Sequence, residues 1–317
     1  MKHVFIIDPK AFNNQQWKMD GLLDSIGQHF RTQEKSNFST LFTHYPREAM
    51  GLIQKQIEEA DEDEIIRVYA VGGDDVLFDC LNSITELPNM ELAIAPYGDT
   101  NNFIRSFGDG KTELFKDIAL LTDAPTISTD IIKAGNNCAI NGCAVGLTPA
   151  VAMKMRDLES KLEKGLNRFA RAFLFFMSNL ITLFDKEITA QHYTIIIDDN
   201  DYSGNYSLIN IVNGLYFSRN KAVLPGTMPD DGLLDIVLIK SVAPLLIMRA
   251  MRKYSRGKIR SHTIRVQAKK IEIKSDKPMW IQTDSEYLQD TGINFEVVPG
   301  AVQIATVNDL TYQRILK

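Results

Sequence analysis

The sequence contains few cysteines. Only Cys80, Cys138 and Cys143 occur in 317 residues, without a Cys-x-x-Cys pair or a neighbouring cluster of histidines. Three cysteines cannot form a closed set of disulfides, so a small disulfide-stabilised secreted domain is excluded. A reducing, cytoplasmic compartment fits best.

No apolar run is long enough to span a bilayer. The longest, residues 172–184, is shorter than the roughly 20 residues that a spanning helix needs, and it contains Ser178 and Asn179. The opening MKHVFIID is interrupted at Asp8 and predicts a first β-strand, not a signal peptide. We therefore expect no transmembrane segment.

The chain also lacks an excess of positive charge. Its net charge of -5 gives no general reason to bind nucleic acid or an anionic membrane. The exception is residues 251–262, MRKYSRGKIRSH, which contain basic residues and no acidic residue. A solvated face is the default interpretation, but this segment could also contact a membrane peripherally.

Two familiar nucleotide motifs are missing. Gly110-Lys111-Thr112 resembles the end of a P-loop, but the glycine required five residues earlier is replaced by Arg105. No G-x-G-x-x-G follows a predicted strand. A P-loop is therefore rejected, and a dinucleotide-binding Rossmann site is unsupported.

What is present is a length suited to two domains and a change of texture near residue 124. Residues 1–124 alternate strands and helices, which predicts a doubly wound parallel sheet. The strands are expected at 3–7, 38–43, 65–71 and 92–95, and the helices at 17–30, 47–60, 76–84 and near 112–121.

Residues 125–305 predict an antiparallel β-rich domain with one helical insertion. Strands are expected within 126–147 and at 193–197, 207–212, 234–239, 263–268, 271–274, 279–282 and 293–298, and the helix at 165–184. Residues 308–315 suggest a helix, so that 306–317 would return to the first domain. The phenylalanines of 168–184 are explained most simply by core packing, with an acyl-chain surface as the alternative.

Parallel strands carry ligands at their carboxyl ends, which here places four segments on one rim. These are DPKAF (8–12), Thr43, GGDD (72–75) and PYGDTNNF (96–103). Two glycine turns at adjacent strand ends form a backbone-lined concavity suited to a polyanion. The simpler interpretation of GGDD is a tight turn with Asp74 capping the helix.

Two acidic segments lie in the second domain. In PDDGLLDIVLI (229–239), Asp231 belongs either to a solvated turn or to a divalent-cation site with nearby carbonyls. In WIQTDSEYL (280–288), Asp284 and Glu286 are two residues apart, which on an extended stretch points both to one face. Most such pairs are surface residues, but a pair facing a cleft could act as a general base.

Taken in order, these segments resemble the diacylglycerol kinase catalytic-domain family of soluble lipid kinases. That family includes the sphingosine kinases and is more distantly related to NAD kinases and phosphofructokinases. GGDDVLFDCLNSI (72–84) is similar to its Gly-Gly-Asp-Gly-Thr turn, and IAPYGDTNNFIRSFG (94–108) to its Pro-x-Gly-Thr-x-Asn-Asp-Phe segment. PDDG and TDSE (283–286) resemble its Asp-Asp-Gly and Asp-Gly-Glu motifs.

The resemblance implies an ATP-binding α/β domain and a β-sandwich-like lipid-binding domain with a cleft between them. Glu286, with Asp284 beside it, would be the general base on a lipid hydroxyl. Asp231, with the carbonyls of Met228 and Leu233, would hold a structural Mg²⁺. The nucleotide would lie against Thr43, Gly72, Gly73, Asp74, Asp75, Gly98, Asp99, Thr100 and Asn101.

The chain departs from the family pattern at several of these positions. Asp75 and Val76 replace Gly-Thr, Asp99 replaces a threonine, and Ser285 replaces the glycine of Asp-Gly-Glu. A carboxylate about 4 Å from a phosphate charge is unfavourable by about 4 kcal/mol at an effective dielectric constant of about 20. A cation that bridges Asp74, Asp75 or Asp99 could compensate.

The leading hypothesis is a cytoplasmic, peripherally membrane-associated kinase that transfers phosphate from Mg-ATP to a lipid hydroxyl, with diacylglycerol as the default substrate. The alternative is a pseudokinase that binds a lipid, a metal or another partner without catalysis. An NAD kinase ranks third, because the Asn-Glu pair expected of it is absent. The oligomeric state stays open, and a homodimer is compatible with the sequence.

Overall fold

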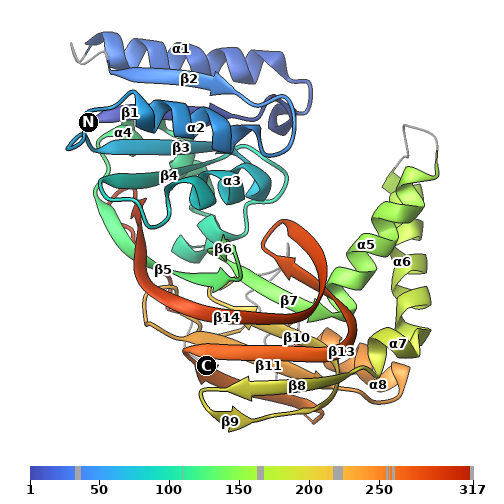
Figure 1. Cartoon of the computed structure of the whole chain (residues 1–317). Coiled ribbons are helices and arrows are strands. Elements are labelled where there is room, and N and C mark those ends of the chain that lie inside the picture. Colours follow the sequence, from blue (N-terminus) through green and yellow to red (C-terminus); the bar gives the residue numbers. More distant parts are fainter. Residues whose placement is uncertain are drawn as a thin grey trace.

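The structure is a computed structural model and describes residues 1–32, 37–108, 110–162, 168–216, 224–254, 256, 258 and 261–314. A parallel α/β unit is followed by an antiparallel β unit (Figure 1). This is the predicted fold class. Residues 255, 257, 259 and 260 of the basic segment, and 315–317 at the end of the chain, lie outside the described residues.

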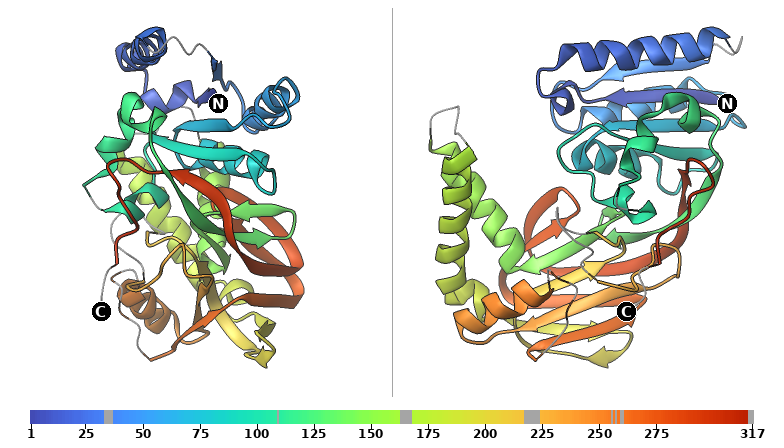
Figure 2. Two further views of the ribbon diagram at one scale, coloured as in Figure 1. Left: turned by 90° about the vertical axis from the view of Figure 1, so that its left-hand side faces the viewer. Right: turned by 180° about the vertical axis from the view of Figure 1, so that it is seen from behind.

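The first unit is a parallel sheet in the order β2-β1-β3-β4. Its strands are β1 (Lys2–Ile7), β2 (Phe38–Phe42), β3 (Ile66–Gly72) and β4 (Met90–Pro96). Helices α1 and α4 lie on one face and α2 and α3 on the other, which makes the sheet doubly wound (Figure 2). These helices are α1 (Gln16–Thr32), α2 (Glu48–Glu58), α3 (Asp74–Ile84) and α4 (Ile118–Thr122).

Short 3-10 helices complete this unit, namely η1 (Pro9–Phe12), η2 (Phe103–Phe107) and η3 (Thr112–Lys116). The single helix predicted near 112–121 is therefore η3 followed by the short α4. Asp117 separates the two, and its carboxylate accepts a hydrogen bond from the amide of Leu120 at 3.2 Å. A capping aspartate starts a new helix at this point.

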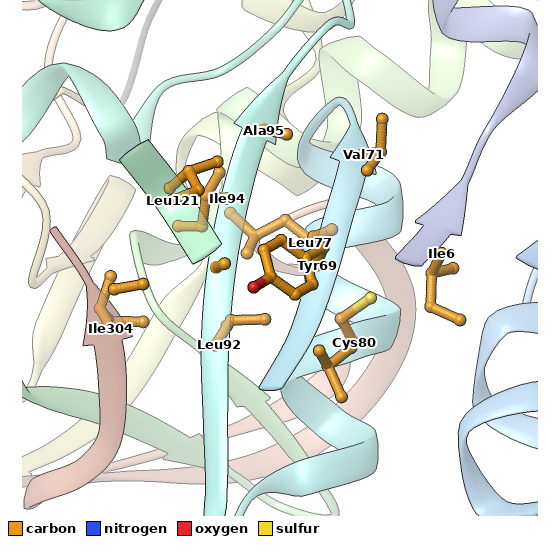
Figure 3. Packing of buried hydrophobic residues seen from close by; sticks show 14 of the residues in the cluster. Ile6, Tyr69, Val71, Leu77, Cys80, Leu92, Ile94, Ala95, Leu121 and Ile304 are labelled. Carbon is orange, nitrogen blue, oxygen red and sulfur yellow. The ribbon is translucent and has the colours of Figure 1, made fainter. Parts of the chain in front are cut away.

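The central strands are buried on both faces, which explains why they are continuous apolar runs and not alternating patterns. Figure 3 shows Tyr69 of β3 and Leu92 of β4 packed with Leu77 and Cys80 of α3. All four side chains are at most 5% exposed. This packing holds the strand ends, and the turns that follow them, in fixed positions.

The second unit is antiparallel. Its strands are β5 (Thr126–Ala134), β6 (Asn137–Ala139), β7 (Gly142–Gly146), β8 (His192–Ile197), β9 (Asn200–Asp201), β10 (Gly204–Val212), β11 (Leu234–Lys240), β12 (Thr263–Ala268), β13 (Lys270–Thr283) and β14 (Glu286–Ala305). The strands predicted at 271–274 and 279–282 are one strand, β13, with a register shift between Lys274 and Met279.

The two units share one continuous sheet, because β14 pairs antiparallel with β5 and parallel with β4. Ile304 of β14 lies beside Leu121 in the core of the first unit (Figure 3). The chain then continues into that unit, where Tyr312 packs against Phe103 and Phe107.

The helix predicted at 308–315 is wrong over the part that the structure describes. Residues 308–314 form a turn and irregular chain. Asn308 and Asp309 have φ angles of 50° and 53°, in the left-handed region, and an α-helix cannot continue through such residues.

Among the described residues, the helices of the second unit are α5 (Leu147–Ser160), α6 (Arg168–Phe184), α7 (Lys186–Thr189) and α8 (Pro244–Tyr254). Only α6 was predicted. Helices α5 and α6 form an antiparallel pair that projects from the sheet (Figures 1 and 2). In the part of the chain that the structure describes, no helix is both long and apolar enough to cross a membrane.

The interpretation of α6 as a core element is wrong for its phenylalanines. Five of them are between 54% and 85% exposed, namely Phe169, Phe173, Phe175, Phe176 and Phe184. The side chains that face inward include Ser178 and Thr182, which are buried. The helix therefore presents its aromatic face to the outside.

Candidate active site

The two glycine turns predicted at the strand ends pack directly on each other. The amide of Gly98, after β4, donates to the carbonyl of Gly72 at 2.8 Å. A Cβ atom on Gly98 would lie 2.5 Å from the Cα atom of Gly73, so no larger residue fits at Gly98. Gly73 caps α3, whose first residue, Asp74, follows at once. The backbones of both segments thus form one surface at the carboxyl end of the sheet.

Asp74 is directed into the second turn. Its carboxylate accepts hydrogen bonds from the amide of Asn102 at 3.1 Å and from the Asn102 side chain at 2.9 Å. The Asp74 amide donates to the carbonyl of Thr100, and Asn101 donates to the carbonyl of Gly98. Burial raises the pKa of Asp74 to about 6, against the lowering effect of the Asn102 amide. Asp74 therefore holds the two glycine-turn segments together.

Asp284 and Glu286 do not share a face, so that prediction is wrong. Strand β13 ends at Thr283 and β14 begins at Glu286, and these two residues pair with each other. Asp284 is in the connecting turn, with a left-handed φ of 46°. A tight turn sends its side chains in different directions, whereas the prediction assumed an extended stretch.

The Asp284 carboxylate lies half-buried beneath the β6–β7 connection. It accepts hydrogen bonds from the amides of Ile140 at 2.8 Å, Asn141 at 3.2 Å and Gly142 at 2.8 Å. Burial raises the pKa of Asp284 to about 7, although these amides favour the ionised form. Asp284 and Asp74 line the same cavity of about 40 Å³. The Asp284 carboxylate therefore links the turn between β13 and β14 to the β6–β7 connection.

The raised pKa of Asp284 predicts a pH-dependent stability. An unfolded aspartate ionises near pH 4, so the folded state alone resists ionisation as the pH rises towards about 7. We expect the free energy of unfolding to fall across this window by about 1–4 kcal/mol more in the wild type than in Asp284→Asn. Chemical denaturation at a series of pH values measures both slopes.

Asp276→Asn is the matched control, because Asp276 is an exposed aspartate of β13, the strand that leads into the Asp284 turn. Its pH profile should follow that of the wild type. Equal slopes in the wild type and Asp284→Asn would contradict the assignment, whatever the overall loss of stability in the variant.

Glu286 faces a larger cleft of about 360 Å³ between the two units. Thr43 and Asp75 line the same cleft, so the end of β2, the start of α3 and the start of β14 meet there. The amide of Thr43 donates to the carbonyl of Ile7 at 2.9 Å, which holds Thr43 beside the end of β1. The cleft also exposes the basic residues Lys10, Arg47 and Arg156 and the acidic residues Asp8 and Asp79.

Arg47 connects the two sides of this cleft. Its guanidinium forms ion pairs with Asp79 on α3 and with Glu286 on β14, and it lies 4.4 Å from the centre of the Phe78 ring. Burial raises the pKa of Asp79, and the Arg47 hydrogen bond acts in the opposite direction. Arg47 therefore neutralises carboxylates from both units at once.

The backbone of Arg47 is strained, with φ 70° at the N-cap of α2. This left-handed conformation costs a residue with a Cβ atom about 1–2 kcal/mol, whereas glycine adopts it freely. Neither Arg47 nor Lys10 and Arg156 were identified from the sequence. No local pattern marks them, because only the tertiary structure brings α2, η1 and α5 to one cleft.

Asp99, the second added carboxylate, lies on the exposed rim and accepts a hydrogen bond from Asn13 at 3.2 Å. It is not among the residues that line the 360 Å³ cleft. Asp75 is exposed as well, so solvent screens both carboxylates, but only Asp75 lines the cleft. Asp75 remains the acidic substitution that matters for a ligand in this cleft.

Asp231 lies apart from the cleft, in the turn before β11. Its carboxylate accepts a hydrogen bond from the amide of Leu233 at 3.0 Å. Burial raises the pKa of Asp231, and the carboxylates of Asp235, Asp130 and Asp230 raise it further. Such a concentration of negative charge fits a divalent cation. Within the described ranges, no three His, Cys, Asp or Glu side chains form a metal cluster, so carbonyls would have to complete the site.

Two family descriptions match the chain. Residues 2–134 match the diacylglycerol kinase catalytic domain, and residues 165–306 match the YegS C-terminal NAD kinase beta sandwich-like domain. A protein of Staphylococcus aureus strain bovine RF122 / ET3-1, named "Putative lipid kinase", is 26% identical over 247 residues, covering 77% of this chain and 78% of its own length. A protein of S. aureus strain Newman with the same name is 25% identical over the same share.

Solved structures from Bacillus anthracis str. Sterne share the fold. One, described as the crystal structure of a "putative diacylglycerol kinase", has a TM-score of 0.73 at 23% identity and covers 98% of both chains. A second, also described as a "putative diacylglycerol kinase", has a TM-score of 0.72 at 22% identity over the same coverage. With the two domain matches in their order along the chain, this protein belongs to the diacylglycerol kinase catalytic-domain family.

Proposed function

We propose that the protein is a lipid kinase that transfers the γ-phosphoryl group of Mg-ATP to a lipid hydroxyl, with diacylglycerol as the default substrate. The observation that carries this proposal is the 360 Å³ cleft, in which Glu286 of the second unit faces Thr43 and Asp75 of the first. A kinase that uses a general base needs this base and a phosphate-binding surface on opposite sides of one cavity. Family membership supports the same chemistry.

In the proposed reaction the lipid hydroxyl oxygen attacks the γ-phosphorus, and the bond between that phosphorus and its bridging oxygen breaks. Glu286 accepts the hydroxyl proton, and ADP leaves with the bridging oxygen. Magnesium on the phosphates neutralises charge. We expect the phosphates to lie against the backbone surface that the packed turns at Gly72 and Gly98 form at the carboxyl end of the sheet.

Arg47 could allow a phosphate to bind near the negatively charged carboxylate of Asp75. While Arg47 holds Glu286, that carboxylate cannot take a proton from a substrate. We propose that the incoming phosphates take over the guanidinium, which frees Glu286 and offsets the charge of Asp75. Arginine suits this exchange, because its planar fork pairs with either a carboxylate or a phosphate.

The structural Mg²⁺ belongs to the same proposal. Asp231, with the carbonyls of Met228 and Leu233, would hold this ion. The ion would stabilise the turn before β11 by offsetting the repulsion between neighbouring carboxylates. We expect Mg²⁺ to raise the melting temperature of the wild type by a few degrees and that of Asp231→Asn by less. Asp201→Asn, at an exposed hairpin, should respond as the wild type does. Equal shifts in all three proteins would contradict the site.

The test of function combines binding and turnover. Mg-ATP is titrated calorimetrically into the protein, and transfer of radioactive γ-phosphate is then measured into diacylglycerol vesicles and into a mixed lipid extract. Labelled lipid in either sample would support the kinase. Label in the extract but not in diacylglycerol would mean that the protein is a lipid kinase with another substrate.

The engaged state of Glu286 and the presence of Asp75 favour a second candidate, a pseudokinase of the same fold. Binding of Mg-ATP without any labelled lipid would support that candidate. The absence of both Mg-ATP binding and lipid labelling would also contradict the kinase proposal. The two functions are therefore separated by one pair of measurements.

A further inference from the structure

The most unusual surface of the molecule is the outer face of α6. The side chains of Phe169, Phe173, Phe176 and Phe184 follow one another along the helix at intervals of four, three and eight residues, which places them on one side. Each is more than half exposed. Soluble proteins rarely leave a contiguous aromatic surface open unless it meets a partner. We name this side of α6 the aromatic face.

The buried side chains of α6 lie near its C-terminal end. Ser178 and Thr182 face inward and are at most 2% exposed, and Thr182 donates a hydrogen bond to the carbonyl of Ser178 at 2.8 Å. Leu183 is buried beside them, whereas the four phenylalanines are exposed along the length of the helix. The aromatic face is therefore not the side by which α6 packs on the rest of the protein.

Helix α8 extends this surface at the same end of the molecule. Leu183 of α6 and Ile247 of α8 belong to one buried cluster, so the two helices share a base. On the outside of α8, Leu245 and Met248 are exposed. Residues 244–262 contain six basic residues and no acidic residue, although the whole chain carries a net charge of -5. Of these basic residues, Arg249, Arg252 and Lys253 lie on α8 itself, so the base of the aromatic face adjoins a basic helix.

We propose that the aromatic face of α6 and the basic segment of α8 dock this protein on an anionic phospholipid bilayer. Aromatic and aliphatic side chains enter the boundary between headgroups and acyl chains, and basic residues meet the lipid phosphates. A second copy of the chain fits less well. Symmetric pairing through this face would bring the two basic segments towards each other.

This assignment replaces the expectation that residues 251–262 alone make the membrane contact, because α6 supplies the apolar part. It rests on the proposed function for its purpose, since a lipid kinase must reach its substrate in a bilayer. Its test is independent, because vesicle binding is measured without ATP. Failure of docking and failure of catalysis are therefore distinguishable.

The test is cosedimentation with phosphatidylcholine vesicles and with vesicles of equal parts phosphatidylcholine and phosphatidylglycerol. The wild type should bind the anionic vesicles more tightly, and raising the salt from about 0.1 M to about 1 M should weaken this binding. The double variant Phe173→Ser, Phe176→Ser should lose at least about tenfold in partition coefficient. Lys253→Glu should lose about fivefold or more.

Two control variants make the same kinds of substitution at exposed positions away from α6 and α8. Trp17→Ser removes an aromatic side chain that is 70% exposed on α1, and Lys55→Glu reverses an exposed charge on α2, both in the first unit. Each should bind vesicles as the wild type does. Thermal unfolding confirms that all variants are folded.

Losses in the α6 and α8 variants no larger than in their controls would overturn the proposal. So would a wild type that binds neither kind of vesicle. Light scattering after size-exclusion chromatography addresses the competing occupant. A wild-type dimer that Phe173→Ser, Phe176→Ser converts to a monomer would assign the aromatic face to a second copy and also overturn the proposal.

Discussion

Replacing Glu286 with glutamine is expected to lower kcat by about two to four orders of magnitude, the range typical of a lost general base. The affinity for Mg-ATP should stay the same or increase. The neutral amide no longer holds Arg47, which is then free to meet phosphate, and it removes one negative charge from the cleft. Initial rates of lipid labelling and calorimetric titration of Mg-ATP measure the two quantities separately.

Glu296→Gln provides the matched control, because Glu296 is an exposed glutamate of the same strand, β14. It should have wild-type kcat and affinity. If kcat of Glu286→Gln lay within about threefold of the wild type, Glu286 would not be the base. A drop in kcat accompanied by much weaker Mg-ATP binding would instead indicate a damaged cleft.

Replacing Arg47 with glycine is expected to weaken Mg-ATP binding by about 10- to 100-fold. One cation within about 4 Å of a phosphate stabilises it by about 4 kcal/mol at an effective dielectric constant of about 20, and part of this is spent on releasing Glu286 and Asp79. Glycine adopts the left-handed conformation freely, so the backbone of α2 should not suffer. Calorimetric titration gives the dissociation constants.

A double-mutant cycle isolates the compensation between Arg47 and Asp75. Asp75→Gly alone should tighten Mg-ATP binding, and in the double variant the two opposite changes should largely cancel, to within about threefold of the wild type. Arg47→Lys should be intermediate, because it keeps the charge but loses the planar fork. The cycle thus measures whether this protein offsets its acidic substitution with Arg47.

Glu86→Gly is the control for the backbone and for the loss of an ion pair. Glu86 also has a left-handed φ, of 68°, and pairs with Lys133 outside the cleft. Its affinity for Mg-ATP should equal that of the wild type. If Arg47→Gly behaved in the same way, Arg47 would be a structural link between the units and not a phosphate ligand.

The proposed active site and the proposed docking surface both use the α5–α6 helix pair of the second unit. The cleft takes Arg156 from α5, and α5 packs on α6, which carries the aromatic face. A bilayer that binds α6 would therefore lie against the helix pair that supplies a cation to the cleft. Stimulation of lipid labelling by anionic vesicles would be the consequence.

The sequence by itself determined the elements whose signals are local. Alternating strands and helices up to residue 124 identified the doubly wound sheet, because buried parallel strands are continuous apolar runs wherever they occur. The two glycine turns were equally local signals, and the structure packs Gly73 against Gly98. Helices α5 and α8 were not predicted. For α8, which begins at Pro244, the basic residues suggested a solvated face or a membrane contact but no helix.

Only the tertiary structure decided what surrounds the proposed base. Glu286 and Asp284 are neighbours in the chain, but the hairpin turn separates them into different cavities. Arg47 and Glu286 are far apart in the chain, but the cleft joins them. Likewise, the composition of α6 was visible in the sequence, but its outward direction depends on which side packs against α5. Charge pairing and burial depend on distance in space, which a local pattern does not contain.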